Sequence, residues 1–155
     1  MTTVLPPLLR TDDPLHFEQT YRRDRVSAPL ARHDLRSWLL QRVGLPMRSM
    51  AAAEPVVAEL TANAIVHGAG MHIHLDARLR PGLLRVAVQD SSREVPFLVC
   101  AGQGPHESGH GLLVVTAVCD RWGVELSLPA GKWVWAQLHL PTGSLGAEDR
   151  RRQSA

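Results

Sequence analysis

Hydrophobic and polar positions repeat with two different periods along the chain, and these periods separate predicted strands from predicted helices. Alternation over residues 15–21, 71–79 and 83–89 predicts three strands, the first of them at a sheet edge. Residues 122–128 and 133–140 predict two more strands, joined by a Pro-Ala-Gly-Lys turn.

Apolar residues at helical spacing predict three helices. The first runs from about 27 to 44, and the second from about 51 to 67 with Pro55 near its first turn. The segment 111–120 is apolar enough for either a strand or a helix. Its length of about ten residues and its Gly-x-Gly start favour a helix.

The predicted order is strand, helix, helix, two strands, a long loop over 91–108, helix and two strands. Antiparallel hairpins separated by helices predict an α+β two-layer sandwich rather than a doubly wound parallel sheet. With 155 residues, 45% of them hydrophobic, the chain has enough apolar material for one domain. We expect that domain at 14–141, between a flexible arm at 1–13 and a disordered tail at 142–155.

Composition and charge argue against several classes of protein. No apolar run approaches the ~20 residues that cross a bilayer, and the start lacks the pattern of a signal peptide. The two cysteines are too few for a disulfide framework, so a cytoplasmic protein with reduced thiols is expected. The net charge is +2, and the basic clusters at 21–25 and 150–152 contain or adjoin acids. They are interpreted as solvated faces rather than as a nucleic-acid surface.

Three polar residues share one stripe of the otherwise apolar segment 56–67. Glu59, Asn63 and His67 lie four residues apart and therefore on the same face of the predicted helix. On a buried helix they would need a polar pocket, and the alternative is that the stripe faces solvent. A carboxylate can accept a proton from a nucleophile, and an amide oxygen can ligate a hard cation such as Mg²⁺.

Two further segments carry candidate chemistry. Asp90 ends a predicted buried strand, where its carboxylate either accepts a hydrogen bond from an exocyclic amine such as that of adenine or begins a turn. In Ser108-Gly109-His110-Gly111-Leu112, glycines allow the backbone to approach a phosphate at a helix N-terminus. An ordinary start of a helix is the alternative, and no Walker A lysine follows.

Together these motifs resemble those of the GHKL, or histidine-kinase-like, ATPases, and in particular the small anti-sigma-factor serine/threonine kinases. The resemblance covers about residues 15–141. It rests on the order Glu59-x-x-x-Asn63-Ala64, Asp90, Gly109-x-Gly111-Leu112, Asp120-Arg121-Trp122-Gly123 and Gly131-Lys132-x-Val134-Trp135-Ala136.

The resemblance implies a Bergerat fold, in which three helices cover one face of a mixed, mostly antiparallel sheet. It implies that ATP and Mg²⁺ bind between helices and a mobile lid at 93–107. It also implies a sigma factor and an anti-anti-sigma protein of the STAS type as partners, and a homodimer, with no direct contact to nucleic acid or membrane. Carried over by position, Glu59 is the general base, Asn63 ligates Mg²⁺, Asp90 and Ser92 lie at adenine, and Gly109, His110, Gly111 and Leu112 follow the phosphates.

Two departures from the family pattern support an alternative function. Ser92 stands where a glycine usually lets adenine approach the backbone, and Trp133 stands where a threonine is usual. Trp133 either crowds the base or packs on the outer face of the sheet. The alternative is a non-catalytic partner-binding module with a degenerate nucleotide site. A third reading places a metal between His67, His72 and His74, although a solvated strand face is favoured there.

Overall fold

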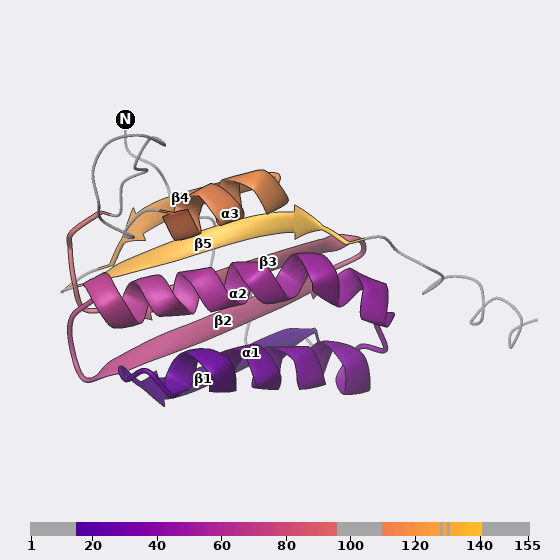
Figure 1. Ribbon diagram of the computed structural model, residues 1–155, viewed down its shortest axis with the longest axis horizontal. Coiled ribbons are helices and arrows are strands. Elements are labelled where there is room, and N and C mark those ends of the chain that lie inside the picture. Colours follow the sequence, from indigo (N-terminus) through magenta and orange to yellow (C-terminus); the bar gives the residue numbers. More distant parts are fainter. Residues whose placement is uncertain (1–14, 96–109, 128, 130, 141–155) are drawn as a thin grey trace, which may run out of the picture.

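Five antiparallel strands form one sheet, and helices cover one of its faces (Figure 1). The computed structural model describes residues 15–95, 110–127, 129 and 131–140. The expected two-layer α+β sandwich is confirmed. Each of the four pairings in the described sheet is antiparallel, whereas the resemblance implied a mixed sheet. Across the sheet the order is β1 (His16–Arg22), β2 (His72–Arg80), β3 (Leu83–Asp90), β5 (Lys132–His139) and β4 (Arg121–Leu126).

The helices follow the strands from one edge of the sheet to the other. In Figure 1, α1 lies next to β1, α2 crosses the middle of the sheet, and α3 lies next to β4. No described helix is long and apolar enough to cross a membrane. Their bounds are α1 (Ser27–Ser37), the π-helix η1 (Trp38–Arg42), α2 (Met47–His67) and α3 (His110–Val118).

The hydrophobic core lies between α2 and the sheet face that the alternating strands present to it. The inward positions predicted for 71–79 and 83–89 are all buried, which confirms the period-two pattern. On the helix side, Val56, Val57 and Leu60 of α2 are at most 1% exposed and belong to the same cluster. The polar positions of α2 therefore lie along the edges of this apolar face, where a site can form.

The second helix differs from its prediction at its start. It begins at Met47, after the extended residue Pro46, so Pro55 lies inside the helix and not near its first turn. A proline there has no N–H to donate to the carbonyl of Ala51. The neighbouring Ala53 and Val56 are buried, and their packing holds the helix against the sheet where this hydrogen bond is missing.

The first predicted helix also changes character before its end. After Ser37 the backbone widens into a π-helix, in which the N–H of Val43 donates to the carbonyl of Trp38 at 3.2 Å. Gly44, with φ of 72°, ends this segment as predicted. The predicted arm at 1–13, the tail at 142–155 and most of the loop at 91–108 lie outside the described residues.

Candidate functional site

Glu59 of α2 and Gly111 of α3 lie in direct contact. A Cβ atom built on Gly111 would overlap Oε2 of Glu59 and lie 3.2 Å from its Cδ. The Glu59 carboxylate therefore lies beside the first turn of α3, where backbone N–H groups are unsatisfied by the helix and favour negative charge. The contact joins two of the predicted site residues, which are 52 positions apart in the sequence.

Asn63 lies one turn of α2 beyond Glu59, and both residues are half-buried. His67, the third residue of the stripe, is exposed. Within the described residues, the side chains of Glu59 and Asn63 make no hydrogen bond to protein groups. An available carboxylate and an available amide oxygen, four residues apart on one helix face, match the hard oxygen ligands that Mg²⁺ prefers. The Asn63 amide oxygen therefore fits a magnesium ion, and the Glu59 carboxylate beside it is available to accept a proton.

Asp90 lies at the C-terminal end of α2. Gly68 follows the helix, and a Cβ atom there would lie 2.8 Å from Cγ of Asp90. Gly68 lies nine positions after Glu59, which is about 14 Å along a helix. The two predicted halves of the site thus lie at separate points along α2.

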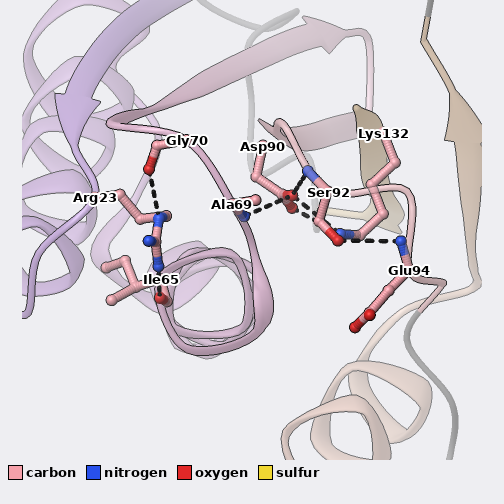
Figure 2. A network of polar contacts seen from close by, with 8 residues as sticks. All are labelled: Arg23, Ile65, Ala69, Gly70, Asp90, Ser92, Glu94 and Lys132. Carbon is pink, nitrogen blue, oxygen red and sulfur yellow. Dashed lines mark hydrogen bonds and ion pairs between the residues drawn. The ribbon is translucent and has the colours of Figure 1, made fainter. Parts of the chain in front are cut away.

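The Asp90 carboxylate is buried and contacts three neighbouring donor groups (Figure 2). Its Oδ1 atom accepts hydrogen bonds from the N–H of Ser92 at 2.6 Å and from the N–H of Ala69 at 3.4 Å. Nζ of Lys132 lies 2.9 Å from Oδ2 and 3.1 Å from Oδ1. Of the two readings considered for Asp90, the hydrogen bond from the N–H of Ser92 is the one expected of a residue that begins a turn. The motif analysis gave Lys132 no role of its own.

Arg23 holds the segment that passes beside Asp90 (Figure 2). Its Nη1 donates to the carbonyl of Ile65 in the last turn of α2, and its Nε donates to the carbonyl of Gly70, both at 2.7 Å. A cation at these carbonyls also suits the negative end of the helix dipole. The interpretation of cluster 21–25 as a solvated face is therefore wrong for Arg23, which is half-buried.

Gly68 and Gly70, on either side of Ala69, let the chain between α2 and β2 run close to β3. Gly70 has φ of 86°, and a Cβ atom there would lie 2.5 Å from Oγ of Ser91. The N–H of Ser91 donates to the carbonyl of Ala69 at 3.0 Å. This Gly-Ala-Gly segment was assigned no role from the sequence, although two glycines so close together signal a tight approach of backbones.

The other predicted ligand-binding residues divide into described and undescribed ones. Gly109 lies outside the described residues, as does the side chain of His110, whose backbone begins α3. Leu112 points into the protein, with 5% exposure, so its backbone alone faces the site. Ser92 is half-buried, and its Oγ accepts the N–H of Glu94 at 3.0 Å. Of the predicted lid, residues 93–95 are described and have no regular structure.

Trp133 lies on the sheet face opposite to Asp90. Along β5, Lys132, Val134 and Ala136 are buried on the helix side, and Trp133 alternates with them. Of the two positions considered for this ring, packing on the outer face is therefore the one that the structure shows.

The described part of the chain gives no support to a metal site between His67, His72 and His74. No group of three His, Cys, Asp or Glu side chains there is arranged to hold a metal ion. Nδ1 of His74 instead shares a hydrogen bond of 2.8 Å with Oγ1 of Thr20 across the β1–β2 pair.

A family model and a solved structure each match most of this chain. Residues 22–138, which include α2, α3 and Asp90, match the family model of the histidine kinase-like ATPase domain. No curated protein matches the chain. Among solved structures, the RsbU and RsbW domains of Rv1364c from Mycobacterium tuberculosis are similar, with a TM-score of 0.61 and 20% identity. That match covers 81% of this chain and 32% of the other, so this chain spans about a third of that protein's length. The chain belongs to the histidine kinase-like ATPase domain family.

Proposed function

We propose that this protein binds Mg-ATP and acts as an anti-sigma factor with serine/threonine protein kinase activity, phosphorylating an anti-anti-sigma partner. The observation that carries the proposal is the contact between Glu59 and Gly111, which puts a carboxylate beside the first turn of α3. Family membership implies ATP as the nucleotide.

The phosphate end of the proposed site lies between α2 and α3. Free N–H groups in the first turn of α3 suit phosphate oxygens, and the Glu59 carboxylate lies beside them in the space that Gly111 leaves. The Asn63 amide oxygen is the proposed ligand of Mg²⁺, which neutralises charge on the phosphates when it is bound. The base end lies at Asp90, with Ser92 beside it.

Glu59 has the position and the chemistry of a general base. In the proposed reaction its carboxylate accepts the proton of the partner's serine hydroxyl as that oxygen bonds to the γ-phosphorus. The bond between the γ-phosphorus and the bridging oxygen breaks, and ADP leaves with that oxygen. Because the Glu59 side chain makes no hydrogen bond within the described residues, no described donor occupies the lone pairs that must accept this proton.

The proposed partners are a sigma factor, which the protein would restrain, and an anti-anti-sigma protein of the STAS type, which it would phosphorylate. A homodimer in the cytoplasm is part of this proposal. The likeness in fold to a structure that contains an RsbW domain supports the choice of partners.

The test is incubation of the protein with Mg-ATP labelled at the γ-phosphate and a STAS-type partner. We expect label on a serine or threonine of the partner and a matching release of ADP. Nucleotide binding without transfer to any such partner would contradict the kinase assignment.

A non-catalytic partner-binding module is the second candidate, and a specific observation favours it. The Asp90 carboxylate is already paired with Lys132, so the base end is engaged without a nucleotide. This candidate predicts that a sigma factor binds equally well with and without ATP. Measurable ATP turnover would rule it out.

A further inference from the structure

Two opposite charges are buried together at the base end of the proposed site. The side chain of Asp90 is 1% exposed and that of Lys132 is 4% exposed, and both carboxylate oxygens contact the ammonium group (Figure 2). The residues face each other directly in the register of β3 and β5. The pair is thus fixed by the strand register, and both members lie on the face that the helices cover.

The Asp90 carboxylate is closed to a ligand in this structure. Its Oδ1 atom contacts three donors, the N–H groups of Ala69 and Ser92 and the ammonium group of Lys132, and its Oδ2 atom contacts Lys132. The side chain is 1% exposed. An exocyclic amine needs direct contact with a carboxylate oxygen, so it can bind Asp90 only if a group that covers the carboxylate moves away.

Lys132 is the donor that can leave. The N–H groups of Ala69 and Ser92 belong to the backbone, and Arg23 and the neighbouring strand hold the Ala69 segment in place. Lys132 reaches Asp90 through a flexible four-carbon side chain. Its backbone is held by Gly131, which has φ of 112° and packs against the backbone carbonyl of Asp90.

We propose that Lys132 sets the nucleotide affinity of this site by occupying the Asp90 carboxylate in the absence of ligand. This inference rests on the proposed function, because it assigns the base of the nucleotide to Asp90. Binding of an adenine nucleotide then requires the ammonium group to move off Asp90, and its affinity is lowered by the loss of that ion pair. The Lys132 ammonium group thus competes with the base of the nucleotide for the Asp90 carboxylate.

Calorimetry with Mg-ATP on the wild type, Lys132→Met and Lys132→Arg tests the inference. Methionine keeps the length and the apolar character of the stem but frees the carboxylate, whereas arginine keeps the positive charge. We expect Lys132→Met to bind ATP at least about tenfold more tightly than the wild type, the equivalent of one charge-assisted hydrogen bond. Lys132→Arg should gain nothing. An equal or weaker affinity of Lys132→Met would overturn the inference.

Inorganic tripolyphosphate with Mg²⁺ separates this inference from the proposed function, because it has no base to reach Asp90. Its affinity should be the same in all three proteins. If tripolyphosphate binds but ATP binds no better to Lys132→Met, the inference fails and the phosphate site stands. If none of the three proteins binds either compound, the proposed function fails, and the inference fails with it.

A second measurement uses the wild type alone, because Lys132→Met leaves a buried carboxylate that costs stability. Lys132 is the single lysine of the chain, so lysine labelled with ¹³C gives one ε-CH₂ signal in an NMR spectrum. Saturating Mg-ATP should move this signal toward its position in the urea-unfolded protein, and tripolyphosphate should leave it in place. A signal that stays unchanged with ATP bound would overturn the inference.

Discussion

Glu59 fills the space in which a side chain at residue 111 would lie, so α2 and α3 meet where a glycine and a carboxylate face each other. The N-terminus of α3 stabilises the negative charge of the Glu59 carboxylate, which is half-buried. Because of this contact, the effect of a substitution at one of the two residues on stability should depend on the side chain at the other.

Stability should reveal this coupling directly. Gly111→Ala inserts a methyl group against the Glu59 carboxylate and should lower the free energy of unfolding by about 1–3 kcal/mol. In a Glu59→Ala background the obstruction is gone, and alanine in a helix is favoured over glycine by about 0.5–1 kcal/mol. Gly111→Ala should then be neutral or stabilising. Urea unfolding of the four proteins measures the coupling, and equal effects of Gly111→Ala in both backgrounds would contradict the contact.

Removal of the proposed base should reduce catalysis and spare binding. Glu59→Gln keeps the size of the side chain but accepts protons poorly, so phosphoryl transfer to the partner should fall by about a hundredfold or more. ATP affinity should change little. The matched control is Glu54→Gln on the same helix, where the carboxylate pairs with Arg36. Transfer by Glu59→Gln at the rate of the control would remove Glu59 from the mechanism.

The end of α2 should depend on Arg23. Arg23→Met removes two hydrogen bonds from a charged donor to the carbonyls of Ile65 and Gly70, and should lower the free energy of unfolding by about 1.5–3 kcal/mol. Arg22→Met is the control, because Arg22 is exposed on β1 and surface changes usually stay within about 0.5 kcal/mol. Equal unfolding midpoints for the two variants would show that Arg23 does not hold the helix end.

Stability should also fall in alkaline solution. Burial, with a smaller effect from the charge of Asp120, raises the pKa of the Cys119 thiol from 9.0 to about 11. Burial and then the hydrogen bond to Asp34 raise the pKa of Tyr21. Folding keeps both groups neutral, so their contribution is complete below pH 9 and, for Cys119, is lost as the pH rises through about 11.

Urea unfolding at pH 7.5, 9 and 10.5 measures this decline. In Cys119→Ala the loss of stability between pH 9 and 10.5 should be smaller than in the wild type, because one of the titrating groups is gone. Identical losses in the two proteins would show that Cys119 does not contribute.

Local patterns were enough to predict most of the fold. Period-two alternation identified the strands and their inward residues, such as Ile73 and Val86, because each strand has one face on the core. The length of the segment 111–120 and its Gly-x-Gly start identified α3 in spite of its valines. Two local predictions were incomplete, at Pro55 and at the π-helix after Ser37, because packing on the sheet outweighs local preference at those places.

The site was less predictable, since its contacts depend on register and on distant segments. The ion pair between Asp90 and Lys132 joins residues 42 positions apart, and only the pairing of β3 with β5 brings them together. Arg23 looked like one charge in a solvated cluster, because nothing near it in sequence marks the end of α2. Glu59 and Asn63 were identified because their four-residue spacing on an apolar helix is a local signal.

Calorimetry with Mg-ATP tests most directly whether this chain binds a nucleotide along α2. We expect saturable binding that weakens at least about tenfold when Mg²⁺ is withdrawn or when Asn63→Ala removes the proposed ligand, since either change removes the metal contact. The exposed amide variant Gln41→Ala should bind like the wild type. Absence of binding at millimolar ATP, in the wild type and in Lys132→Met alike, would contradict the account.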